Sequence, residues 1–188
     1  MKNIYIVLSH TGTILSGIVR MTTFAKYGHV SICLEDDVSE LYSFGRLDPY
    51  NPFIGGFVKE SPDFGTFLRF KHTRVAIYAL PVEDETYFAM KTYLETMYEH
   101  KTEYKYNTKG IFLAKFNRNI KRPNYYYCSE FVGDILTRFA IVEKDYFKDV
   151  IVPKEFRKIP GTKKIYEGKL FAFSKRNPKR ISLALQPR

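Results

Sequence analysis

The apolar residues of this chain fall into short runs with two different periods, and the order of these runs constrains the fold. Runs rich in β-branched and aromatic residues predict strands. These runs cover residues 3–8, 29–34, 39–44, 67–71, 74–80 and 170–173. Apolar positions at helical spacing predict helices over residues 13–24, 84–100 and 129–140. Because the strands mostly do not alternate with the helices, the pattern predicts an α+β fold.

Turn-forming residues divide these runs. The acidic residues 35–37 form a predicted turn that joins two of the strands into a hairpin. Residues 45–62 carry several glycines and prolines, which predict a loop. Pro81 is expected to end the strand before it. Residues 104–124 are predicted to be irregular, with a helical turn near residues 111–116.

The length of 188 residues suits one domain spanning residues 1–188. No apolar run approaches the roughly 20 residues that a membrane helix needs. The first apolar run is interrupted by Ser9, His10 and Thr11, too early for a signal peptide. These features predict a cytoplasmic protein without a transmembrane segment.

The formal net charge of +10 permits attraction to anionic partners. Much of the charge lies in residues 115–122 and 175–188, which we expect to be solvated loops or tails. No recognisable RNA- or DNA-binding motif accompanies it. The charge therefore favours solubility and general anion affinity, and we expect no dedicated nucleic-acid partner.

Two cysteines, Cys33 and Cys128, are the residues of greatest chemical interest. In a reducing compartment they are expected to be two separate thiols and not a disulfide. The four histidines show no metal-ligand spacing, so the sequence predicts neither a metal nor another cofactor. Cys33 lies between Ile32 and Leu34 on a predicted strand and is expected to be an inert core thiol.

Cys128 stands at the predicted start of a helix, after three consecutive tyrosines. The first N–H groups of a helix are unpaired and carry positive potential, which stabilises a thiolate or an oxyanion. Taken alone, Cys128 is better interpreted as a buried small apolar residue, because it precedes Phe131 and Val132 on the apolar face. The same holds for His29, which starts an apolar strand and by itself is better interpreted as a core histidine.

Two short motifs favour the catalytic interpretation. Residues 27–32 (YGHVSI) resemble the histidine-bearing strand of the NlpC/P60-type cysteine peptidases, and residues 126–132 (YYCSEFV) resemble their cysteine-bearing helix start. In the ordinary order of that superfamily the cysteine comes first. Here His29 precedes Cys128, as in the circularly permuted papain-like branch, which includes YiiX-like bacterial hydrolases and the lecithin:retinol acyltransferase group. The resemblance extends over about residues 1–140 and implies an antiparallel sheet packed against helices.

The resemblance also implies a mechanism. Cys128 would attack a carbonyl carbon to form a thioester, and His29 would exchange the protons. The backbone N–H of Cys128 would form part of an oxyanion hole. His29 and Cys128 are accordingly expected to approach within hydrogen-bond reach.

A third residue usually orients the histidine in these relatives, and it lies on the following strand. Alignment of the hairpin with that pattern places Ser43 at this position, and Glu40 is the chemically stronger alternative nearer the turn. Arg46 begins the glycine- and proline-rich loop, either as a surface residue or as a ligand for a substrate anion.

The sequence therefore predicts a hydrolase or acyltransferase acting on an amide, ester or thioester, with a small-molecule, peptide or lipid-like substrate. One alternative is a non-catalytic binding module on the same fold, favoured by the absence of an evident third residue. A second alternative is a basic binder of nucleic acid or another anionic surface. The sequence leaves the oligomeric state open.

Overall fold

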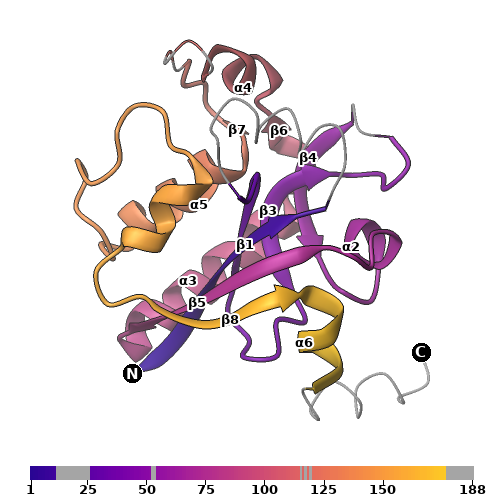
Figure 1. Ribbon diagram of the computed structural model, residues 1–188. Coiled ribbons are helices and arrows are strands. Elements are labelled where there is room, and N and C mark those ends of the chain that lie inside the picture. The colour runs from indigo at the N-terminus through magenta and orange to yellow at the C-terminus, as the bar shows by residue number, and fades with distance from the viewer. Residues whose placement is uncertain (12–25, 52–53, 115, 117, 119, 177–188) are drawn as a thin grey trace.

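A computed structural model describes residues 1–11, 26–51, 54–114, 116, 118 and 120–176 (Figure 1). Within them, strands form one eight-stranded sheet in the order β7-β6-β4-β3-β2-β1-β5-β8. The strands are β1 (Lys2–His10), β2 (His29–Cys33), β3 (Leu41–Arg46), β4 (Gly55–Glu60), β5 (Arg74–Val82), β6 (Lys105–Tyr106), β7 (Tyr125–Tyr126) and β8 (Lys163–Lys169). The helices are α2 (Gly65–Arg69), α3 (Asp84–Glu99), α4 (Thr108–Ala114), α5 (Cys128–Arg138) and α6 (Leu170–Arg176), with short 3₁₀ turns at Lys101–Glu103 and Pro153–Lys158. The α+β expectation is confirmed.

All neighbouring strands of the sheet are antiparallel except β6 and β7, which run parallel. The expected purely antiparallel sheet is therefore corrected to a mixed one. The parallel pair forms because β6 and β7 are joined by a long connection that contains α4, which allows the chain to return in the same direction. The predicted hairpin is confirmed, since β2 and β3 pair in an antiparallel register.

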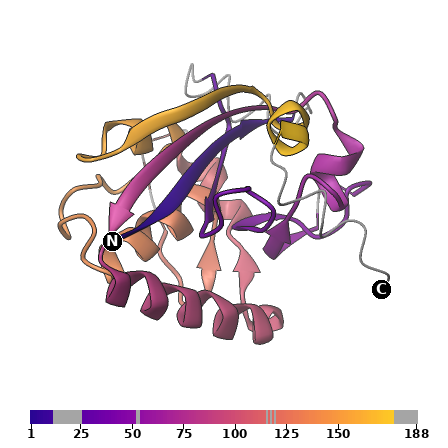
Figure 2. The same cartoon turned by 90° about the horizontal axis from the view of Figure 1, so that it is seen from below.

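Helices cover both faces of the sheet. Figure 2 shows α3 along one side of the strands and α6 on the other. The side chains of β1 alternate accordingly: Ile4, Ile6 and Leu8 join a core under α3 and α5, whereas Tyr5 and Val7 join a second core under α2 and α6. Burial on both faces explains why the middle of β1, from Ile4 to Leu8, is apolar without interruption.

An aromatic cluster holds α5 against the sheet. Phe131 of α5 packs against Phe44 of β3 and Phe57 of β4, with ring centroids 5.3 and 5.1 Å apart. Val132, Ile135 and Leu136 extend this contact along the helix and are fully buried. The apolar face expected for this helix is thus its buried face, and the helix starts at Cys128 itself.

Several sequence-based assignments of elements are wrong. The loop predicted over residues 45–62 contains β4, whose Gly55 and Gly56 lie against the side chains of Tyr106 and Leu47. Residues 67–71 and 170–173 were expected as strands, but Phe67 belongs to α2 and residues 170–173 to α6. Strand β8 was not predicted, because it is an edge strand with mostly exposed, charged residues. Pro81 does not end β5, which continues to Val82.

The helix predicted over residues 13–24 lies outside the described residues. Among the residues that the structure describes, no helix has both the length and the apolar character required to cross a membrane.

Replacement of Phe131 by Ala is expected to lower the free energy of unfolding by about 3–5 kcal/mol, because it removes a buried ring that contacts two others. Urea denaturation followed by circular dichroism measures this change. Phe88→Ala is the matched control, since Phe88 is 54% exposed on α3 and should cost about 1 kcal/mol or less. Equal losses in the two variants would contradict the assigned core.

Candidate active site

Cys128 is the first residue of α5, directly after the N-cap residue Tyr127. The backbone N–H of Tyr127 donates to Glu130 Oε2 at 3.1 Å, and Phe131 N–H donates to the Tyr127 carbonyl at 3.0 Å. Phe131 is therefore the first residue whose N–H group is bonded within the helix. The N–H groups of the first turn before it have no helical acceptors. These donors and the positive end of the helix dipole lie beside the thiol.

Hydrogen bonds to the Glu130 carboxylate fix this helix start. Its Oε2 also accepts from Asn107 Nδ2 at 3.2 Å, and Asn107 is fully buried. Asn107 in turn accepts from Gly110 N–H at 3.0 Å and from Arg122 at 3.3 Å. The glutamate of the motif at residues 126–132 is thus a structural anchor that couples the helix start to the segment before it.

His29 is the first residue of β2 and pairs with Ser9 of β1. Its side chain is only 18% exposed. Burial by itself lowers the pKa of His29, but the charges of Glu60 and Cys128 and side-chain hydrogen bonding with both more than offset it, so the pKa lies well above its usual value. His29 at the start of β2 and Cys128 at the start of α5 therefore lie close enough to interact electrostatically.

Glu60, the last residue of β4, was not predicted. Its Oε2 lies 2.9 Å from His29 Nε2 and accepts a hydrogen bond of 2.7 Å from Ser31 Oγ. The Glu60 side chain is 10% exposed, so its interaction with the imidazole is little screened by solvent. It was missed because β4 was assigned to a loop; the aromatic and β-branched residues Phe57 and Val58 were the signal that could have indicated a strand ending at this carboxylate.

Ser43, the first choice for the third residue, also touches the histidine. Its Oγ lies 3.2 Å from His29 Nε2 and donates to the Val30 carbonyl at 3.0 Å. Because its proton is used on Val30, the Ser43 hydroxyl can only accept from the imidazole. Glu40, the alternative, is instead paired with Lys59 at 2.9 Å and is partly exposed.

Three further residues surround this cluster. A Cβ atom on Gly45 would lie 3.2 Å from Glu60 Oε1 and 3.7 Å from His29 Cε1, so the absence of a side chain makes room for the pair. Tyr106 of β6 is held neutral, because burial and then the charge of Cys128 raise the pKa of its phenol. Arg46 interacts electrostatically with Tyr106 and Glu60, and burial lowers its pKa. Arg46 therefore lies beside the candidate site and is not a remote surface residue.

Cys33 lies in the second core and is completely buried. Burial raises the pKa of its thiol to about 12, and its Sγ donates to the Glu35 carbonyl at 3.2 Å. Both cysteines are free thiols. Among the described residues, no group of three or more metal-ligating side chains comes together.

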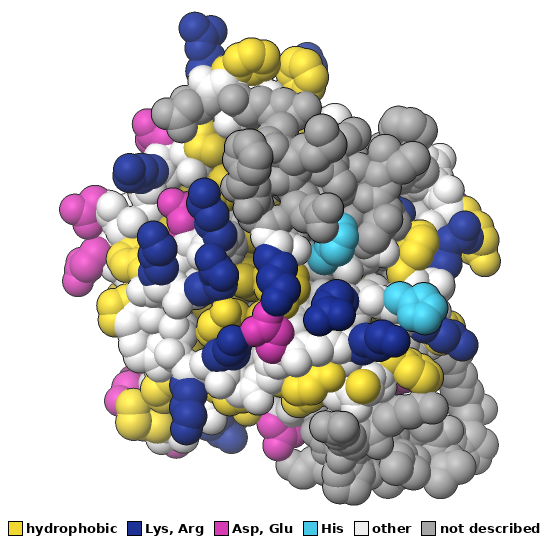
Figure 3. All heavy atoms as spheres, viewed as in Figure 1, with side chains coloured by type: hydrophobic (Ala, Val, Ile, Leu, Met, Phe, Trp, Pro, Cys, Tyr) yellow, Lys and Arg dark blue, Asp and Glu magenta, His cyan; other side chains and the backbone are white. Residues whose placement is uncertain are grey.

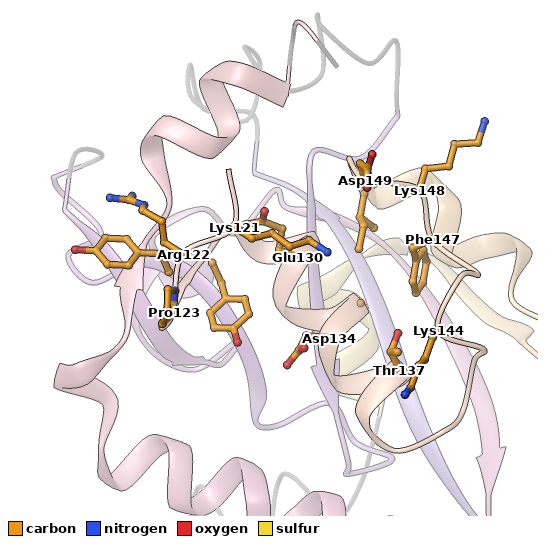
Figure 4. A pocket seen from close by; sticks show the side chains of 14 residues that line it. Lys121, Arg122, Pro123, Glu130, Asp134, Thr137, Lys144, Phe147, Lys148 and Asp149 are labelled. Atoms are coloured by element: carbon orange, nitrogen blue, oxygen red, sulfur yellow. The ribbon is translucent and has the colours of Figure 1, made fainter. Parts of the chain in front are cut away.

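A cavity of about 440 Å³ lies on the outer side of α5 (Figure 4). In the close-up, Arg122 and Pro123 stand on one side, Lys144 and Phe147 on the other, and α5 between them. Neither Cys128 nor His29 lines this cavity. The candidate reaction centre is therefore the thiol–imidazole–carboxylate cluster and not the cavity.

Iodoacetamide is expected to modify Cys128 in preference to Cys33 in the folded protein. Both thiols are buried, but burial raises the pKa of Cys33 to about 12, whereas Cys128 interacts with His29 at a helix start. Peptide mapping by mass spectrometry identifies the modified residue. His29→Ala should slow the labelling of Cys128 about tenfold or more, since the imidazolium stabilises the thiolate. Cys33→Ser should leave the rate unchanged, and preferential labelling of Cys33 would reverse the assignment.

Glu60→Gln is expected to lower the pKa of His29, because the carboxylate charge favours the imidazolium. NMR titration of the imidazole, with Cys128→Ser in both proteins, isolates this effect. Glu40→Gln is the matched control and should leave the titration unchanged, because Glu40 pairs with Lys59. An equal response of His29 to both variants would contradict the role given to Glu60.

The raised pKa of His29 also fixes the sign of a stability effect. The stabilisation from a protonated His29 is fully present below the unfolded-state pKa of about 6.5 and is lost as the pH rises through the folded-state pKa. The free energy of unfolding that Glu60→Gln removes should therefore decrease from acidic to alkaline pH.

Comparisons with known proteins identified no relative of this chain. No family model, no curated protein and no solved structure matches the chain. The chemistry of the cluster formed by Cys128, His29 and Glu60 is therefore the basis for assigning a function.

Proposed function

We propose that this chain is a cysteine hydrolase or acyltransferase of the circularly permuted papain-like kind, acting on an amide, ester or thioester. The observation that carries the proposal is the interaction of His29 with both Cys128, at a helix start, and the buried carboxylate of Glu60. A nucleophile, a base and a group that orients the base are the three parts that covalent catalysis by a thiol requires.

The contacts of the imidazole ring indicate which of its two nitrogens exchanges a proton with Cys128. Nε2 lies against the Glu60 carboxylate and the Ser43 hydroxyl, and neither group has a proton to donate to it, so Nε2 itself is assigned a proton. The proton exchanged with Cys128 is therefore assigned to Nδ1. Glu60 keeps Nε2 protonated and stabilises the imidazolium that forms when the thiol ionises.

In the first half-reaction, the Cys128 thiolate adds to the carbonyl carbon and the carbonyl electrons move to oxygen. N–H groups of the first turn of α5, including that of Cys128, donate to this oxyanion. The intermediate then collapses, the bond to the leaving amine, alcohol or thiol breaks, and His29 Nδ1 supplies its proton. A thioester on Cys128 remains.

In the second half-reaction, His29 takes a proton from water or from another acyl acceptor, which adds to the thioester carbon. Expulsion of the Cys128 thiolate releases the product, and the imidazolium is restored beside it. The phenol of Tyr106 and the guanidinium of Arg46 flank this centre and are the first candidates for contacts with the substrate.

Glu60 bears directly on the non-catalytic alternative. That alternative depended on the lack of a charged group to orient the histidine, and Glu60 supplies one at 2.9 Å. The permuted papain-like assignment accords with a histidine on β2, a cysteine on the later α5, and a shared sheet between them.

Incubation with p-nitrophenyl acetate, a small activated ester, tests the proposal. The expected results are a burst of p-nitrophenol and an acetyl group on Cys128, found by peptide mass spectrometry. Cys128→Ala should abolish both, and His29→Ala should slow acylation about a hundredfold or more. Cys33→Ala is the control and should retain the burst, whereas an unchanged burst in Cys128→Ala would refute the proposal.

A further inference from the structure

The described part of the connection between β6 and β7 (residues 107–114, 116, 118 and 120–124) projects from the sheet at the top of Figure 1 and carries α4 at its tip. We call this connection the α4 knob. It presents large apolar side chains to solvent: Phe112 is 61% exposed, Phe116 65% and Ile120 45%. The two phenylalanine rings lie next to each other, with centroids 6.2 Å apart. A cluster of this kind at a protruding tip is uncommon on a surface that contacts water alone.

The charge of this region has a single sign. From residue 104 to residue 127 the sequence holds six lysines and arginines and no aspartate or glutamate. Lys109, Arg118 and Lys121 are exposed. Figure 3 shows basic and hydrophobic side chains side by side at the top of the molecule, where Figure 1 places α4. The tip therefore combines apolar rings with a positive potential.

The base of the α4 knob is firmly attached to the protein. The buried Asn107 donates to the Ile120 carbonyl at 3.2 Å and to Glu130 at 3.2 Å, which joins the two ends of the segment to each other and to α5. A Cβ atom on Gly110 would lie 2.3 Å from Asn107 Nδ2, so only glycine permits this closure. Because both ends are held, the exposed rings are presented outward by the fold.

We propose that the α4 knob docks onto an anionic lipid bilayer. Phe112, Phe116 and Ile120 enter the boundary between headgroups and acyl chains, and the flanking cations contact anionic headgroups. A bilayer accepts aliphatic and aromatic side chains alike. A single-stranded nucleic acid would use only rings as stacking platforms, and it would leave Ile120 without a role.

Docking is independent of the proposed chemistry, because it uses none of the residues of the thiol–imidazole cluster. The base of the α4 knob contacts α5, because Asn107 donates to Glu130, two residues after Cys128. Cys128→Ala should bind vesicles as the unmodified chain does, so failure of one proposal is distinguishable from failure of the other.

Co-sedimentation of the full chain with vesicles tests the docking. Vesicles of equal parts phosphatidylcholine and phosphatidylglycerol should bind the protein, and vesicles of phosphatidylcholine alone should bind it much more weakly. Phe112→Ser with Phe116→Ser should weaken binding to the anionic vesicles about tenfold or more. Lys109→Glu with Arg118→Glu should weaken it similarly, and added salt should do the same.

Matched controls locate the effect. Phe88→Ser removes a ring that is 54% exposed on α3, and Lys154→Glu with Lys158→Glu changes the net charge equally at exposed positions elsewhere. Both controls should bind within about twofold of the unmodified chain. Absence of binding to anionic vesicles, or equal losses in the controls, would overturn the proposal. So would knob variants that keep vesicle binding but lose binding to single-stranded RNA.

Discussion

The contact of Phe131 with Phe44 and Phe57 holds the two halves of the candidate site in place. Phe131 stands one helical turn after Cys128, so the ring that anchors α5 also fixes the position of the thiol. Phe44 follows Ser43, whose hydroxyl touches His29, so the same contact fixes the strand beside the histidine. Close packing leaves this cluster little room to adjust, and a site built on rigid elements keeps its geometry.

The buried charges depend on this rigidity. A carboxylate and an imidazolium removed from water must be compensated by each other and by further hydrogen bonds. Glu60 obtains these from His29 and from Ser31, and Ser43 adds a second acceptor for His29 Nε2. The helix start at Cys128 adds positive potential, which favours the thiolate. Together these interactions favour the charged forms of groups that a core would otherwise neutralise.

The errors in the sequence-based assignment have specific physical causes. Gly55 and Gly56 predicted a loop, but in β4 they permit close contact with the side chains of Tyr106 and Leu47. The apolar residues of α2 and α6 form runs of only a few residues, for which a strand and a helix are not distinguishable by periodicity. Both segments fold as helices that bury Phe67 and Leu170 in the second core, and only the tertiary structure shows this packing.

Pro81 illustrates the limit of another local rule. It pairs with Asn3 of β1, whereas the register of β8 reaches only as far as Ala79. The missing N–H of the proline therefore costs no hydrogen bond to β8, and β5 continues through it. Whether a proline ends a strand depends on which neighbouring strands need its N–H group. The local sequence does not show those neighbours.

The sequence alone determined that Cys128 starts a helix and that His29 stands on a strand, because both depend on local periodicity and on residues within a few positions. The resemblance placed Ser43 as the residue that orients the imidazole, and its Oγ lies 3.2 Å from His29 Nε2, on the adjacent strand of the hairpin. The choice of Glu60 over Glu40 as the carboxylate partner was decided only by the tertiary structure. The two residues differ little in chemistry, but pairing of β3 with β4 and packing around Gly45 bring Glu60 to the histidine, while Lys59 holds Glu40 at the surface.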